Sequence, residues 1–196
     1  METILDRWSI TAEQLTEVVD ENPSLRGMLF GYVAELKLNE YLTAHPGVTK
    51  SEKDDDHDRS RKGDRRIVYR DQEFVVESKS LQTNSIVQEE GGTYRGKAQV
   101  DASDRRKLTL PNGAQVETTC LMIGEFDILA VNCFAYEGEW HFAFARNEDL
   151  PRSTFRGYSD DQRQYLLASL VEVPWPPQGI FTDDLFELMD EIIEEQ

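Results

Sequence analysis

Residues 63–80 read GDRRIVYRDQEFVVESKS, and the rest of the fold can be placed around this segment. Residues 66–69 and 73–77 are rich in β-branched and aromatic side chains, which favour strands. The three residues between them, 70–72, are polar and leave room only for a tight turn. The segment therefore predicts a β-hairpin.

The predicted hairpin collects charged side chains on one of its faces. Successive side chains of a strand point to opposite faces, so Glu77 and Lys79 share a face while Phe74 and Val76 point into a core. Asp64 begins the first strand, so the turn brings its carboxylate towards that of Glu77. Two converging carboxylates repel each other unless a cation lies between them.

This combination of groups is suited to phosphodiester hydrolysis. Mg²⁺ prefers oxygen ligands and keeps several bound waters. Such an ion can bind a phosphate oxygen, stabilise the charge of the transition state and lower the pKa of an attacking water. A lysine beside the ion, here Lys79, can orient or deprotonate that water or stabilise developing charge.

The chain before the hairpin predicts two helices. Residues 11–14 match a capping box and begin a helix that ends near residue 21. Asn22 and Pro23 then fit the start of a long helix that ends near residue 44. Its apolar residues recur at helical spacing and are expected to face the core: Leu25, Met28, Leu29, Tyr32, Val33 and Leu36.

The chain after the hairpin predicts further strands and then helices. Residues 126–134 are the most apolar run and predict a central strand, and residues 140–145 predict another. A capping box at Ser159 predicts a helix to about residue 170, prolines near 174–177 predict an extended link, and a terminal helix follows Thr182. Loops are expected at residues 50–62 and 88–96, and a turn at 111–113.

These elements predict an α/β or α+β single domain that spans residues 1–196. Its core is expected at about 25–145, with a C-terminal helical segment at about 155–196. No apolar run is long enough to cross a bilayer, no secretory signal is visible at the start, and two cysteines are too few for a disulfide framework. These features predict a cytoplasmic protein whose cysteines are reduced.

The net charge of −17 is unevenly distributed along the chain. Residues 59–107 carry +4, whereas the remainder carries −21. An acidic protein repels nucleic acid as a whole, but a basic segment around the carboxylates of the hairpin can contact phosphates. The overall charge therefore does not exclude a DNA substrate.

The pattern Asp64, Glu77-Ser78-Lys79 resembles the motif of the PD-(D/E)XK nuclease superfamily, which includes most type II restriction endonucleases. Gly63 stands where the motif has its proline. The resemblance covers about residues 25–134 and implies a restriction endonuclease-like core, a central mixed sheet of four to five strands flanked by helices. It also implies a glutamate on the helix before the sheet, and Glu35 suits that position.

The resemblance implies a Mg²⁺-dependent DNA endonuclease, most like a sequence-specific type II restriction enzyme, in which Mn²⁺ can replace Mg²⁺. The implied catalytic residues are Asp64, Glu77, Lys79 and Glu35, and the implied metal ligands are Asp64, Glu77, Glu35 and Ser78. Basic and amide side chains near the motif are candidates for contacts with double-stranded DNA: Arg65, Arg66, Arg95, Lys97, Gln99, Arg105, Arg106 and Lys107. Cutting both strands commonly uses two symmetric sites, so a homodimer is expected.

Two other functions remain open at this stage. The chain can be a structure-specific repair or recombination nuclease, which reads DNA shape and not sequence. Alternatively it can be a non-catalytic protein whose acidic surface binds a basic partner or imitates DNA. The acidic run at residues 54–58 is interpreted as solvated loop, because its spacing matches no calcium-binding loop.

Overall fold

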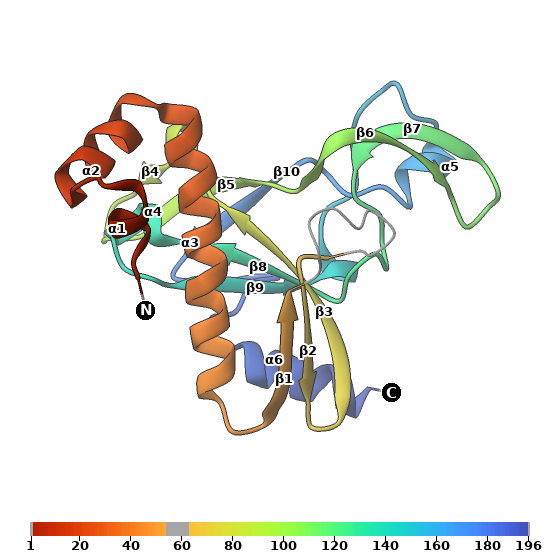
Figure 1. Cartoon of the computed structure of the whole chain (residues 1–196). Coiled ribbons are helices and arrows are strands. Elements are labelled where there is room, and N and C mark those ends of the chain that lie inside the picture. Colours follow the sequence, from red (N-terminus) through yellow and green to blue (C-terminus); the bar gives the residue numbers. More distant parts are fainter. Residues whose placement is uncertain (1, 54–62, 196) are drawn as a thin grey trace.

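The centre of the computed structural model is a five-stranded mixed sheet in the order β1-β2-β3-β8-β9 (Figure 1). The structure describes residues 2–53 and 63–195, so the acidic run at 54–58 and the basic residues Arg59, Arg61 and Lys62 lie outside the described residues. Strands β3 and β8 are parallel, and the other neighbouring pairs are antiparallel. The bounds are β1 Val48–Lys53, β2 Arg65–Tyr69, β3 Gln72–Ser80, β8 Ile128–Asn132 and β9 Phe142–Arg146. The predicted mixed sheet flanked by helices is confirmed.

The predicted hairpin is formed by β2 and β3. Tyr69 pairs with Gln72, and the two residues between them, Arg70 and Asp71, both have positive φ values, of 48° and 64°. Turns with this backbone match the right-handed twist of the strands they join. Parallel pairing with β8 then makes β3 an internal strand of the sheet.

Strand β1 corrects the loop expected at residues 50–62. It pairs along its length with β2, although only Val48 in it is apolar. An edge strand with half-exposed side chains does not need an alternating apolar pattern, so no strand could be predicted there from the residue pattern.

Helices α3 and α6 pack on one face of the sheet. Leu38 and Leu42 of α3 and Leu188 of α6 share a core cluster with Phe74 and Val76 of β3. The predicted helix starts are confirmed, since Thr11 and Gln14 form a reciprocal capping box and α3 begins at Pro23. The helices are α1 Ile4–Trp8, α2 Ala12–Glu21, α3 Pro23–Ala44, α4 Phe134–Glu137, α5 Asp160–Arg163 and α6 Leu185–Glu194, with short 3₁₀ turns η1 Thr83–Ser85 and η2 Asn147–Asp149. No described helix combines the length and apolarity needed to cross a membrane.

The apolar stripe expected to face the core along the first part of α3 is largely exposed. Met28 is 62% exposed and Leu36 is 53% exposed, and Leu25, Leu29 and Tyr32 are also exposed. Helix α3 instead buries Ala34, Leu38 and Leu42. The prediction that this stripe faces the core is therefore wrong, because α3 packs on the sheet through its second part and through other residues.

A second, three-stranded sheet covers the other face in the order β10-β5-β4. Its strands are β4 Val87–Gln88, β5 Tyr94–Gln99 and β10 Leu170–Trp175. Ala98, Val171 and Val173 pack there against Leu129 and Val131 of β8. The helix expected from Ser159 to about 170 stops at Arg163, and the loop expected at 88–96 becomes strand from Tyr94.

This sheet also corrects the extended link expected near 174–177 and the description of residues 155–196 as helical. Pro174 and Trp175 belong to β10, which pairs with β5. The alternation of Val171 and Val173 buries one face of the strand, which favours a strand over a helix. Cys120 and Cys133 are free and buried, as expected of reduced core thiols.

A two-stranded ribbon, β6 Asp101–Thr109 and β7 Gln115–Cys120, extends from the body of the molecule (Figure 1). The turn predicted at residues 111–113 joins its strands. One ion pair ties the ribbon to the turn before β8. The guanidinium of Arg106 donates two hydrogen bonds to the carboxylate of Glu125 and one, at 3.1 Å, to the carbonyl of Cys120. The side chain of Glu125 is only 6% exposed.

We predict that Arg106→Ala lowers the free energy of unfolding by about 3–5 kcal/mol, because it removes one partner of the buried ion pair with Glu125. Arg95→Ala is the matched control, since Arg95 makes only exposed ion pairs and its loss should cost about 1 kcal/mol or less. Urea denaturation of both variants measures the difference. Equal stability of the two variants would contradict a structural role for Arg106.

Candidate active site

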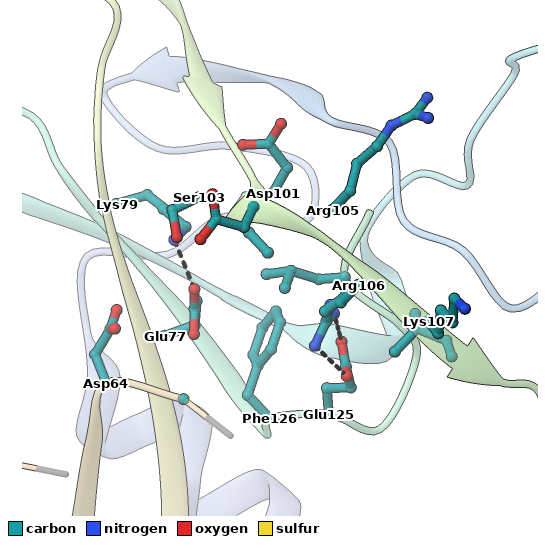
Figure 2. A pocket seen from close by; sticks show the side chains of 15 residues that line it. Asp64, Glu77, Lys79, Asp101, Ser103, Arg105, Arg106, Lys107, Glu125 and Phe126 are labelled. Carbon is teal, nitrogen blue, oxygen red and sulfur yellow. Dashed lines mark hydrogen bonds and ion pairs between the residues drawn. The ribbon is translucent and has the colours of Figure 1, made fainter. Parts of the chain in front are cut away.

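The hairpin brings the side chains of Asp64 and Glu77 to one cavity. Asp64 lies just before β2, whose ladder with β3 ends at the pair of Arg65 and Val76. The backbone N–H of Asp64 donates to the carbonyl of Val76 at 3.0 Å, one residue out of the register of the ladder, and this bond keeps Asp64 against β3. Figure 2 shows the two side chains next to each other at one cavity.

The Asp64 carboxylate is fixed by the strand that carries Glu77. Its Oδ2 accepts a hydrogen bond of 2.7 Å from the backbone N–H of Ser78. A charge-assisted hydrogen bond of this kind holds the carboxylate in place without a second side chain. Ser78 therefore contributes to the site through its backbone amide.

Lys79 supplies the positive charge of the site. Its Nζ lies 2.6 Å from Oε1 of Glu77, and their side chains are 21% and 9% exposed. The two residues share a face because they are two positions apart on β3, as the alternation of a strand predicts. The ion pair is largely withdrawn from water (Figure 2).

Burial raises the pKa of Glu77 to about 7, and the negative charges of Asp64 and Glu125 contribute to the rise while Lys79 opposes it. The pKa of Lys79 is also raised: burial acts to lower it, but the charges of Glu77, Asp64 and Asp101 outweigh burial. Lys79 is therefore an ammonium ion at neutral pH. It can orient a water or stabilise negative charge, whereas removing a proton from water requires that it first lose its own.

The three side chains line a cavity of about 570 Å³ whose other wall is strand β6. Arg105 and Lys107 of β6 also line the cavity, with Arg105 directed away from the carboxylates and Lys107 farther along the strand (Figure 2). Asp101 and Glu125 also line it. Neither acid could be selected from the residue pattern, because only the tertiary structure brings them to the site. Asp101 lies on β6, which crosses the cavity, and Glu125 lies in the turn before β8. The only local signal was that Glu125 immediately precedes the most apolar run.

Asp64 and Glu77 fit a Mg²⁺ site in the chemistry of their donors. Mg²⁺ is usually held by one or two carboxylates, with waters and substrate phosphates as the other ligands. Burial and, to a lesser extent, the charge of Asp64 disfavour the ionised form of Glu77, and a bound cation would favour that form. Among residues 2–53 and 63–195, no group of three or more His, Cys, Asp or Glu residues is arranged to hold a metal.

Glu35 does not line the cavity. Its carboxylate forms an ion pair of 2.8 Å with Nζ of Lys53 on β1. Burial lowers the pKa of Arg65, and the charges of Glu35 and Asp64 oppose that effect, so the Arg65 guanidinium interacts with both carboxylates. The metal-binding roles of Glu35 and Ser78 stay predictions.

The predicted DNA contacts separate into buried and exposed residues. Arg65 is only 9% exposed and donates to Asn39 and Ser51, so it is not placed at a DNA-accessible surface. Arg106 forms an ion pair with Glu125 and stabilises the fold. The other candidates are exposed or partly exposed: Arg66, Arg95, Lys97, Gln99, Arg105 and Lys107. Three of them have polar partners: Arg66 pairs with Glu73, Arg95 with Glu89 and Glu172, and Gln99 with Gln82 and Asp101.

Comparison with known proteins leaves the family open. No protein-family model and no curated protein matches the chain. Among solved structures, the chain is similar to a bacterial homing endonuclease, I-Ssp6803I, with 17% identity, 86% of this chain and 93% of the other covered, and a TM-score of 0.44.

We predict that the affinity of the protein for Ca²⁺, a non-catalytic probe of the site, rises about tenfold between pH 6 and pH 8. A carboxylate must lose its proton to bind a metal, and Glu77, with a pKa of about 7, is mostly protonated at pH 6 and mostly ionised at pH 8. A glutamate with an ordinary pKa is ionised at both values. Isothermal titration calorimetry at the two pH values measures the change.

Asp64→Asn should abolish this Ca²⁺ binding while keeping an oxygen that accepts the hydrogen bond from Ser78. The same substitution at Asp71, in the turn of the hairpin, is the matched control and should bind Ca²⁺ like the wild type. An affinity that is constant from pH 6 to pH 8 would show that Glu77 does not bind the ion with a raised pKa.

Proposed function

We propose that the protein is a Mg²⁺-dependent DNA endonuclease that hydrolyses phosphodiester bonds at Asp64, Glu77 and Lys79. The observation that carries the proposal is the convergence of two carboxylates and one ammonium in a cavity that Arg105 and Lys107 also line. Asp101 and Asp104 of β6 line it too, so carboxylates that can hold a cation and basic groups that can bind phosphates share one cavity. A phosphodiester with a bound divalent ion complements this mixture of charges.

Each residue has a distinct part in the proposed reaction. Asp64 and Glu77 hold the Mg²⁺, which when bound polarises the phosphate and lowers the pKa of water; Mn²⁺ supplies the same chemistry. Lys79, held as an ammonium by Glu77, orients the attacking water and neutralises charge that develops on the phosphate. The backbone amide of Ser78 fixes Asp64, and Arg105 and Lys107 bind the neighbouring phosphates.

The buried ion pair supports a catalytic function over a DNA-mimic function. A protein that imitates DNA presents acids on its surface, whereas the Glu77 side chain is only 9% exposed and paired with Lys79. Burying charged groups is costly and is retained where chemistry needs shifted pKa values. Cleavage of defined substrates shows whether the enzyme recognises a sequence, as a restriction enzyme does, or a DNA structure, as repair and recombination nucleases do.

A homodimer is the assembly that we propose for cutting both strands of a duplex. The uncovered stripe on α3, Leu25, Met28, Leu29, Tyr32 and Leu36, gives it a surface. None of residues 2–33 is buried, and Trp8 of α1 and Val18 of α2 are also exposed. Helices α1 and α2 lie beside the first part of α3 (Figure 1). Acids outnumber bases in α1 and α2, which disfavours DNA as the occupant. A second copy of the chain presents the same apolar stripe, and two-fold symmetric pairing of the stripes brings a second active site into the assembly.

We predict that the wild-type protein cuts DNA with Mg²⁺ or Mn²⁺ and that Lys79→Ala slows cleavage by about 100-fold or more. Plasmid, forked and single-stranded DNA are the substrates, and the products are separated on gels. Lys37→Ala is the matched control, because Lys37 lies on α3 and pairs with Glu40 away from the cavity. No metal-dependent cleavage of any of these substrates, or full activity of Lys79→Ala, would contradict the proposal.

We predict that the wild-type protein has twice the mass of the 22.6 kDa chain in solution and that Met28→Asp is monomeric. Met28 is 62% exposed, so a charge there opposes apolar association without entering the core. Light scattering after size-exclusion chromatography gives the mass, and circular dichroism confirms the fold of the variant. Glu17→Gln on α2 is the control, and a monomeric wild type overturns the assembly.

A further inference from the structure

The outward face of the β6–β7 ribbon carries a continuous set of polar side chains. Lys107 pairs with Glu117 and Thr109 pairs with Gln115, so each pair projects from the same face. All four residues are exposed, as is Arg105. This face therefore presents two adjacent rows of hydrogen-bonding groups and no large apolar side chain.

The opposite face fixes the ribbon against the body. Leu108, Leu110 and Cys120 share a core cluster with Leu166. The hydroxyl of Thr118, on the same face, lies 2.6 Å from that of Tyr158. Together with the buried Arg106–Glu125 ion pair, these contacts make the ribbon a supported arm with a defined outward direction.

The dimensions of the ribbon match the major groove of B-DNA. Neighbouring strands lie about 4.7–4.9 Å apart, and the major groove, about 12 Å wide, admits a two-stranded ribbon. Both rows of outward side chains can then reach base edges at once. The minor groove, about 6 Å wide, is too narrow for two strands.

The chemistry of the face distinguishes base reading from simple phosphate binding. A surface that binds only phosphates excludes carboxylates, yet Glu117 lies directly across from Lys107. In the major groove, Arg and Lys recognise guanine, Gln recognises adenine, Glu accepts from the amino group of cytosine, and Thr contacts the methyl group of thymine. Thr109, Gln115 and Glu117 therefore suit base edges, while Arg105 and Lys107 beside them bind phosphates.

The position of the ribbon links this face to the active site. Arg105 and Lys107 line the same cavity as Asp64 and Glu77. In Figure 2, β6 crosses the cavity, with Arg105 directed away from the carboxylates and Lys107 farther along the strand. A duplex whose phosphate backbone lies in the cavity therefore presents its grooves to the ribbon.

We propose that the outward face of the β6–β7 ribbon reads base edges in the major groove of duplex DNA and gives the protein sequence specificity. The inference rests on the proposed nuclease function, which it deepens by naming the specificity-determining residues. Gln115 and Glu117 are the most informative members, because neither contributes a positive charge.

The test is a binding selection from a pool of randomised duplex DNA in the presence of Ca²⁺, followed by sequencing of the bound fraction. We expect the wild type to enrich one motif. Gln115→Ala and Glu117→Ala should each lower the preference at one or two adjacent positions by roughly 5- to 150-fold, the fold-change that corresponds to about 1–3 kcal/mol per base contact. Gln178→Ala and Glu17→Ala, exposed residues outside the ribbon, are matched controls and should enrich the wild-type motif.

The outcomes separate this inference from the proposed nuclease function. A wild type that enriches no motif, or ribbon variants that enrich the wild-type motif unchanged, would overturn base reading by the ribbon. Cleavage of the same pool with Mg²⁺ is measured in parallel. If the ribbon variants change the enriched motif but the wild type does not cleave, base reading by the ribbon is supported and the nuclease function is contradicted. If the wild type cleaves but the motif does not depend on the ribbon, the nuclease function is supported and base reading by the ribbon is contradicted.

Discussion

The burial of charged side chains at one end of β3 is the constraint on which the candidate site depends. Asp64 is held against this strand by the backbone N–H of Ser78, and a water-poor environment strengthens the repulsion between its carboxylate and that of Glu77. Lys79 lies on the same face of β3, and its Nζ lies 2.6 Å from Oε1 of Glu77. The charge of Lys79 does not offset the cost of burial, since the pKa of Glu77 is still raised to about 7, and the charge of Asp64 adds to the rise. A divalent ion beside the two carboxylates would favour the ionised form of Glu77.

The two faces of β3 lie in different environments. Phe74 and Val76 lie in a core with α3 and α6, while Glu77 and Lys79 line the cavity. Parallel pairing with β8 prevents the strand from moving to separate the charges. The Arg106–Glu125 ion pair then fixes β6 as the opposite wall, so the positive side chains of the ribbon keep their position relative to the carboxylates.

Local patterns in the sequence were sufficient for the hairpin, the helix starts and the convergence of Asp64, Glu77 and Lys79. Alternation along β3 and a two-residue turn determine which side chains share a face, and capping side chains mark helix starts regardless of tertiary context. Long-range contacts decided the rest. The helical spacing of the apolar residues around Met28 shows that they share a face of α3, but it does not show whether the sheet covers that face, and the structure leaves it exposed. Arg65 and Arg106 looked like DNA contacts because their partners, Asn39 and Glu125, lie 26 and 19 residues away along the chain.

The position of a bound metal tests the central claim most directly. Crystals of the protein soaked with Mn²⁺ and measured at the manganese absorption edge reveal the ion by its anomalous signal. The account predicts a peak between the carboxylates of Asp64 and Glu77, and its loss in Asp64→Asn crystals. A peak bound elsewhere, or none at this pair while the crystals hold Mn²⁺ at other positions, would contradict a metal centre at the hairpin.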